Sequence, residues 1–332
     1  MIAFGATERV IGHGAILSRL LAEMAASRLA HAYLFHGPVG VGKATAARAL
    51  ATALFCEGNP EPCGKCPHCV KMDAGVHADF LYLGMAEGKT RIVVDQVREV
   101  ARSISLTPLE SKWRAALVDD AHLLNEQAAN ALLKTLEEPP PNTLLILVTD
   151  RPGAIMPTLR SRCRAVRFSP LADSELAAWV ARQPGVTREV AVEVVKRAMG
   201  SVRRAAALLD EELLAREMRF QEEFGRVISG ETTLAGLCAL AEYWSDRERF
   251  VTATTLLGTW MEERIRSAVT GMGAGREVGA LLEIKNLAET LVRQVHRFNV
   301  NRQLVLEALF IQIAKGRNRE GGNSPFPNKG RG

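Results

Sequence analysis

The sequence lacks any apolar run close to the roughly 20 residues that a membrane span requires. Its first seven residues contain no basic stretch followed by a long apolar segment, so no secretory signal is evident. We therefore expect a cytoplasmic protein that has no membrane partner.

The body of the chain carries little net charge. The formal net charge is +5, but the last 18 residues hold five Lys or Arg residues against one Glu and so carry +4 of it. The remaining +1 gives little support for a direct nucleic-acid interface. We expect the basic end, residues 316–332, to be a disordered tail.

The 332 residues are enough for two or three domains. Up to residue 169, short apolar segments alternate with helical patterns, which predicts an α/β domain with a parallel sheet and a ligand at the carboxyl ends of its strands. After residue 170 the strand signals stop and only helical patterns follow. The strands are expected at residues 32–35, 78–83, 113–118, 144–148 and 165–168.

A glycine-rich segment follows the first predicted strand: residues 37–44 read GPVGVGKA and lead into a helical run. In this context the backbone amides converge on phosphate oxygens, and Lys43 reaches the β and γ phosphates. Ala44, however, stands where Ser or Thr holds Mg²⁺, and Thr45 comes one residue late. We expect a site that binds nucleotide but hydrolyses it poorly, with a ligand-free glycine turn as the alternative. Its expected members are Gly37, Gly40, Gly42, Lys43, Ala44 and Thr45.

Polar residues also follow two other predicted strands. Strand 113–118 runs into Asp119 and Asp120, and the first carboxylate is expected to order the Mg²⁺ shell. Asp120 occupies the place where motor ATPases use Glu to orient the attacking water. The alternative is that one of the two carboxylates caps the following helix. Thr149, at the end of strand 144–148, is expected to sense the γ-phosphate.

Four of the six cysteines fall within 14 residues, at Cys56, Cys63, Cys66 and Cys69. Four closely spaced thiolates wrap one tetrahedral Zn²⁺ and leave no open position, which predicts a structural zinc site. The Gly and Pro residues between the thiols predict tight turns and no helix. The alternative is a redox-active or unpaired thiol set. His68 is expected to be a solvent-facing bystander.

Several motifs occur in a specific order: the glycine loop, the four-cysteine insert, VDDAH at 118–122, NALLKTLEEP at 130–139 and SRC at 161–163. This order resembles the bacterial clamp-loader AAA+ family, and within it the delta-prime subunits of DNA polymerase III. The resemblance extends over residues 8–315. The phosphate loop alone is not specific, whereas the LLKTLEEPP run combined with SRC is.

The resemblance implies an AAA+ nucleotide-binding domain at residues 1–169 with a zinc insert at 56–69. A small helical lid at 170–211 and a helical collar at 212–315 are expected to follow. It also implies a hetero-pentamer with delta and gamma/tau subunits that loads the sliding clamp on primer–template DNA. Delta-prime subunits typically do not hydrolyse ATP. Arg162 would act in trans as an arginine finger in a neighbouring ATP site, and Arg203 matches the second sensor arginine.

Two alternatives remain open at this point. In the first alternative, the chain is an ATP-hydrolysing motor subunit like gamma/tau, although Ala44 and Asp120 argue against that activity. In the second alternative, the chain is a zinc-dependent nucleic-acid-binding module, although the charged side chains around the cysteines show no excess of basic residues.

Overall fold

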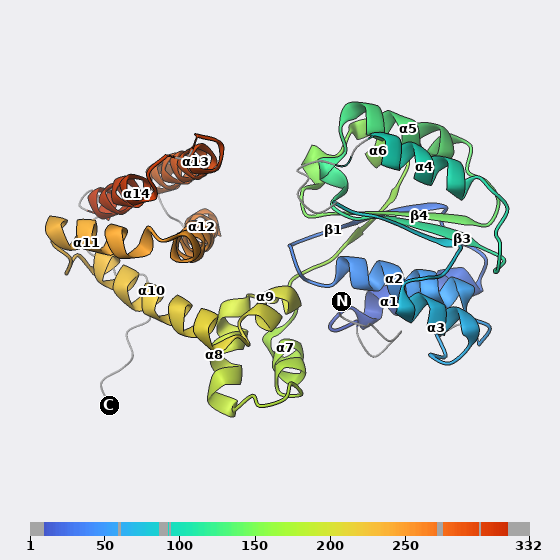
Figure 1. Ribbon diagram of the computed structural model, residues 1–332, viewed down its shortest axis with the longest axis horizontal. Helices are drawn as coiled ribbons and strands as arrows, with labels where there is room; N and C mark the ends of the chain where they lie inside the picture. The colour runs from blue at the N-terminus through green and yellow to red at the C-terminus, as the bar shows by residue number, and fades with distance from the viewer. Residues whose placement is uncertain are drawn as a thin grey trace. The chain divides into compact units, whose positions relative to one another are not determined.

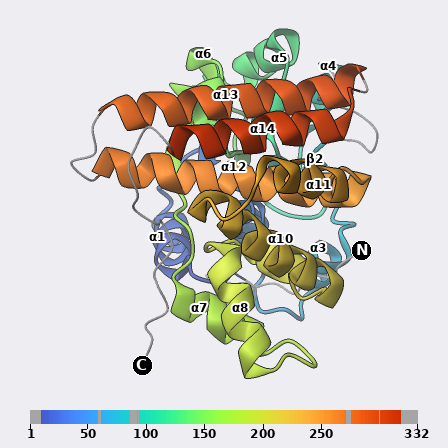
Figure 2. The same ribbon diagram turned by 90° about the vertical axis from the view of Figure 1, so that its left-hand side faces the viewer.

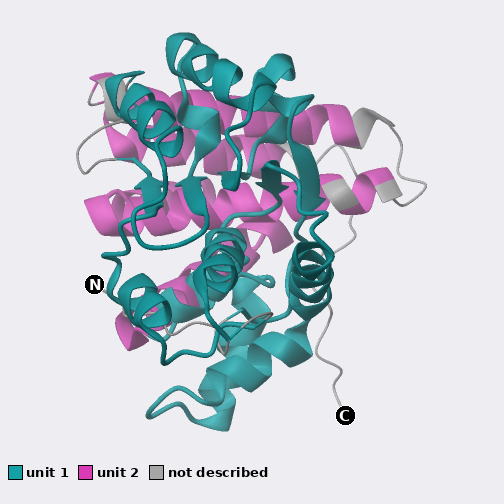
Figure 3. Ribbon diagram, turned by 90° about the vertical axis from the view of Figure 1, so that its right-hand side faces the viewer, with its two compact units in different colours: residues 1–209 teal, residues 210–332 magenta. Residues whose placement is uncertain are grey.

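The computed structural model describes residues 10–58, 61–85, 92, 94–270, 275–298 and 300–317. The chain divides into two compact units, Met1–Leu209 and Asp210–Gly332 (Figure 3). Among the described residues, no helix has both the length and the apolar character needed to cross a membrane. The finer division into three domains stays a prediction, and the expected tail lies outside the described residues from 318 onward.

Unit 1 is built on a five-stranded sheet in the order β2-β3-β4-β1-β5, and every neighbouring pair is parallel. The parallel sheet predicted from the sequence is therefore confirmed. Because β1 lies between β4 and β5, the loop after β1 opens beside the ends of both neighbours. The strands are β1 (Ala32–His36), β2 (Phe80–Leu83), β3 (Arg114–Val118), β4 (Thr143–Thr149) and β5 (Arg164–Arg167).

Helices cover both faces of the sheet (Figure 1). On one face lie α1 (Gly14–Ala25), α2 (Lys43–Phe55) and α3 (Pro67–Ala74), and on the other α4 (Val94–Ile104), α5 (Glu126–Glu137) and α6 (Pro157–Arg160). Alternate residues of one strand enter different cores: Tyr33 and Phe35 face α2, whereas Leu34 faces α4 and α5. Every residue of β4 is buried, as its continuous apolar run requires.

Local signals set the helix boundaries. Asn125 caps α5 by accepting a hydrogen bond from the Ala128 amide, and the prolines from Pro139 onward prevent the helix from continuing. One expectation is wrong: α3 begins within the cysteine cluster, with Pro67 in its first turn and the Cys66 sulfur accepting from the Cys69 amide. A proline suits the first helical turn because its missing N–H has no intrahelical partner there.

Short helices complete unit 1. The single turns η1 (Ala121–Leu123) and η2 (Pro152–Ala154) follow β3 and β4. The last three helices are α7 (Asp173–Val180), α8 (Arg188–Ala198) and α9 (Val202–Ala207). Backbone hydrogen bonds join this helical part to the chain after β5, since the Leu171 amide donates to the Gly200 carbonyl.

Unit 2 is helical throughout its described residues, as predicted. Aromatic side chains form its core, where Phe220 packs edge-on against Trp244 and lies beside Phe224 and Phe310. In Figure 2 three of its helices, α12, α13 and α14, lie side by side. The last helix continues through residue 317, two residues into the range expected to be disordered. The helices are α10 (Glu211–Ser229), α11 (Leu234–Trp244), α12 (Arg247–Thr270), α13 (Gly275–Phe298) and α14 (Arg302–Arg317).

Candidate nucleotide and metal sites

The glycine loop connects β1 to α2 as predicted, and its glycines are required by close approach. A Cβ on Gly37 would lie 2.1 Å from the Phe168 carbonyl oxygen, and a Cβ on Gly40 would lie 2.3 Å from Ser201 Oγ. Gly42 precedes α2 in a left-handed conformation. The loop is therefore packed between β5 and the start of α9, and larger residues do not fit there.

Lys43 is buried, and its ammonium group is held by the loop itself. Its Nζ donates to the carbonyl oxygens of Gly37, at 2.8 Å, and Pro38, at 2.6 Å. Burial lowers the pKa of Lys43, while the carboxylates of Asp150 and Asp119 oppose this shift. Bound phosphate oxygens would have to replace these two carbonyl partners. Ala44 and Thr45 follow in the first turn of α2, and Ala44 offers no hydroxyl to a metal ion.

Asp119 and Asp120 lie at the end of β3, as predicted. The half-buried Asp119 carboxylate accepts from the Asp120 amide at 3.0 Å, and the Tyr82 hydroxyl donates to it at 3.5 Å. Burial raises the pKa of Asp119, and the neighbouring Asp120 charge raises it further. The capping alternative is wrong, because Asp120 makes no side-chain cap bond to η1 and Asn125 caps α5.

Thr149 is fully buried at the end of β4, and its hydroxyl is engaged within the chain. Its Oγ1 accepts from the Arg151 amide and lies 3.2 Å from His122 Nδ1. His122 Nδ1 also lies 3.2 Å from Asp150 Oδ1, without hydrogen-bond geometry. His122 and Asp150 were not predicted as site residues, although Asp150 directly follows Thr149 and His122 comes two residues after Asp120. Together with Asp120 they place ligand atoms within 4.8 Å of one another.

The two predicted arginines contact different parts of unit 1. The backbone amide of Arg203, in α9, donates to the Gly40 carbonyl at 3.2 Å, so this residue does border the phosphate loop. Arg162 lies between α6 and β5. Its guanidinium pairs with Glu137 at 2.7 Å and donates to the Thr158 carbonyl at 3.0 Å.

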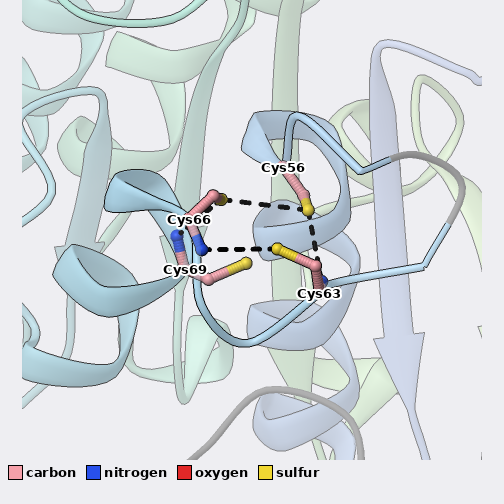
Figure 4. Close-up of side chains that lie close together, drawn as sticks. All are labelled: Cys56, Cys63, Cys66 and Cys69. Atoms are coloured by element: carbon pink, nitrogen blue, oxygen red, sulfur yellow. Dashed lines mark hydrogen bonds between the residues drawn. The ribbon is translucent and has the colours of Figure 1, made fainter.

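The four clustered cysteines face one another from the end of α2, the following loop and the start of α3 (Figure 4). Their sulfur atoms all lie within 4.8 Å of one another, and those of Cys56 and Cys66 are 4.0 Å apart. Zinc–sulfur bonds of about 2.3 Å in a tetrahedron place sulfurs about 3.8 Å apart. The donor set therefore fits a closed tetrahedral zinc site.

Backbone amides also point at these sulfurs. Gly58 and Cys63 amides each donate to Cys56 Sγ at 3.2 Å, and the Cys66 amide donates to Cys63 Sγ at 3.4 Å. Backbone amides, that of Lys65 foremost, lower the pKa of Cys63 to about 6, whereas burial raises the pKa of Cys56 and Cys69. Amides directed at sulfur favour thiolate, the form that binds metal.

The expectation that His68 is a solvent-facing bystander is wrong. Its side chain is only 14% exposed, and its Nδ1 lies 2.9 Å from Nε2 of the buried His77. His77 stacks on Phe55 at 4.2 Å between ring centroids and accepts from the Asp79 amide. His68 thus ties the cysteine insert to the segment that precedes β2, a contact that sequence spacing does not reveal.

Comparison with known proteins finds relatives among the subunits of DNA polymerase III. A family model described as DNA polymerase III, delta subunit matches residues 12–172. The DNA polymerase III subunit delta' of Pseudomonas aeruginosa is 30% identical over 86% of this chain and 92% of its own length. That of Escherichia coli is 35% identical over 57% of this chain and 58% of its own.

The gamma/tau subunits are also similar, over a smaller part of their length. That of Mycobacterium tuberculosis H37Rv is 36% identical over 61% of this chain, which spans 36% of that relative. A solved gamma-subunit-related protein of Thermotoga maritima covers 91% of this chain and 99% of its own at 17% identity, with a TM-score of 0.45.

The match to the Pseudomonas aeruginosa protein covers nearly all of that relative, whereas the matches to the gamma/tau subunit of Mycobacterium tuberculosis and the tau subunit of Bacillus subtilis each cover less than half of theirs. The α/β fold with helical segments after it, expected from the resemblance, is confirmed. The chain belongs to the delta-prime family of DNA polymerase III subunits.

Proposed function

We propose that this chain is a clamp-loader subunit that helps to place a sliding clamp on primer–template DNA. Its partners would be delta and gamma/tau subunits in a hetero-pentamer, in the cytoplasm. The similarity to a delta' subunit over 92% of that protein's length carries this proposal. Ala44 supports a subunit that does not drive the reaction itself, because it offers no hydroxyl for Mg²⁺.

Within the complex, Arg162 acts in trans as an arginine finger. Its side chain is 36% exposed, so a phosphate group of a neighbouring subunit can reach the guanidinium. Arginine fingers stabilise charge that develops on the transferred phosphoryl group and are worth roughly 10³–10⁵ in rate at the site they serve.

The test is the Arg162→Ala variant in a complex reconstituted with purified gamma/tau, delta and clamp. We expect normal assembly by size-exclusion chromatography and slower clamp-stimulated ATP turnover, because one ATP site loses its finger. The matched control, Arg182→Ala, replaces another exposed arginine and should leave turnover unchanged. Unchanged turnover in an assembled Arg162→Ala complex would refute the finger assignment.

The phosphate loop of this chain is a nucleotide site without strong hydrolytic capacity. Gly40, Gly42 and Lys43 would hold the phosphates, Asp119 residual metal, and Thr149 the γ-phosphate. The proximity of Arg203 to Gly40 supports its assignment as a second sensor. The motor alternative retains support from the 36% identity to gamma/tau subunits and from Lys43.

The cysteine insert is a structural zinc site, with Cys56, Cys63, Cys66 and Cys69 as ligands. Zinc would fix the chain between α2 and the first turn of α3. The rest of the proposed organisation has an AAA+ domain up to residue 169, a lid up to 211 and a collar that joins the ring up to 315.

A further inference from the structure

The guanidinium of Arg162 is anchored at two points on two elements. Its Nη2 lies 2.7 Å from Glu137 Oε1 at the end of α5, and its Nη1 donates to the Thr158 carbonyl in α6 at 3.0 Å. Helices α5 and α6 lie side by side on the same face of the sheet (Figure 1). An arginine has five N–H donors. Among the described residues the guanidinium has no further hydrogen-bond or ion-pair partner, so its remaining donors are available to a phosphate group.

Glu137 belongs to a well-packed helix. It is the last residue of α5, whose inner face is buried through Ala128, Leu132 and Leu136. A carboxylate at the carboxyl end of a helix faces the negative end of the helix dipole, which is unfavourable. The cation of Arg162 offsets this. The pair therefore joins a rigid helix end to a flexible arginine side chain.

We propose that Glu137 is a positioning residue for Arg162, and this rests on the proposed function of Arg162. The carboxylate restricts the guanidinium to one arrangement at the surface, so that less side-chain freedom is lost when a phosphate of the neighbouring subunit binds. Glu137 itself does not touch the nucleotide.

The opposite role, withholding the arginine from its target, does not fit the exposure of the pair. The Glu137 side chain is 48% exposed and that of Arg162 is 36% exposed, so water screens their attraction. Such a pair orients a side chain but competes weakly with a multiply charged phosphate group. Positioning is therefore the role that the geometry supports.

The experiment measures kcat and KM for clamp-stimulated ATP turnover by the reconstituted complex. Glu137→Ala should lower kcat by about tenfold, less than Arg162→Ala, and should leave KM nearly unchanged. Glu137→Gln, which keeps a hydrogen-bond acceptor, should restore part of the loss. Glu138→Ala is the matched control, because this neighbouring glutamate is exposed and, among the described residues, its side chain makes no hydrogen bond or ion pair.

The same substitutions are repeated in the Arg162→Ala background. If Glu137 acts through Arg162, Glu137→Ala has no further effect there. An equal loss in both backgrounds, an unchanged kcat, or faster turnover by Glu137→Ala would each overturn the positioning role. If Arg162→Ala alone leaves turnover unchanged, the finger assignment falls first and the positioning role with it, which distinguishes the two failures.

Discussion

Asp79 shows how one residue organises a loop through contacts distant in sequence. Its fully buried carboxylate accepts hydrogen bonds from the amides of Leu109, Glu110 and Ser111 at 2.7–2.9 Å. It also pairs with the buried Arg114 guanidinium at 3.2 Å. Burial by itself raises the pKa of Asp79, but the three amides and Arg114 outweigh this and lower it to about 2.

Asp79→Ala should destabilise unit 1 strongly. Removing one partner of a buried ion pair costs about 3–5 kcal/mol, because the other charge stays buried without compensation. The measurement is urea unfolding of the full chain, monitored by circular dichroism. The control is Asp95→Ala, which removes an exposed pair with Arg98 and should cost less than about 1 kcal/mol. Equal effects of the two variants would contradict this account of Asp79.

The pH dependence follows from the same contacts. The pKa of Asp79 is about 2 in the folded protein and about 3.9 in the unfolded chain. The ionised carboxylate therefore stabilises the fold fully above about pH 4. This stabilisation is lost as the pH falls from about 4 to about 2. Asp79→Asn should flatten the acid side of the stability profile in this window, as urea unfolding at a series of pH values would measure.

Such residues mark the limit of sequence reasoning at this scale. Lys43, Asp119 and Thr149 could be singled out because each stands at a fixed offset from a recognisable strand. The partners of Asp79 are 30 or more residues away, and those of His68 and His122 also come from other segments. A single sequence contains no signal for pairings that depend on how the chain folds back.

At the scale of elements, strands were predicted more reliably than the cysteine insert. The apolar run of β4 is short and lies between the prolines at 139–141 and Pro152, which favours a strand covered on both faces over a buried helix. In the insert, the Gly and Pro residues between the thiols predicted tight turns and no helix, yet Pro67 occupies the first turn of α3. Proline disrupts a helix interior but suits its start, and the sequence pattern alone did not distinguish the two positions.

The insert also carries the element-scale prediction. Purified protein should contain one zinc per chain by elemental analysis, because the four sulfurs lie within 4.8 Å of one another and can close around one ion. Cys63→Ser should lower the zinc content and the melting temperature, since metal binding supplies folding free energy. Cys238→Ser, in α11, is the control and should change neither. A chain that is free of zinc but keeps its melting temperature would rule out a structural metal.

At the scale of the whole molecule, the sequence predicted an α/β part followed by helices, because strand signals end abruptly after residue 170. Boundaries were harder to place: the compact units separate after Leu209, and the hydrogen bonds of Leu171 and Arg203 tie the helices α7–α9 to the sheet part. Periodicity identifies helices, but contacts between them decide which ones form a unit.

The last prediction concerns the chain by itself, assayed for ATP turnover with Mg²⁺ and primed DNA. We expect none above background. Ala44 gives no hydroxyl to the metal, Asp120 is one methylene shorter than the usual glutamate, and a finger would have to come from another subunit. Turnover that persists in Lys43→Ala would mark a contaminant. Robust turnover that disappears in Lys43→Ala would mean that other groups compensate for Ala44, and the motor assignment would then replace the one proposed here.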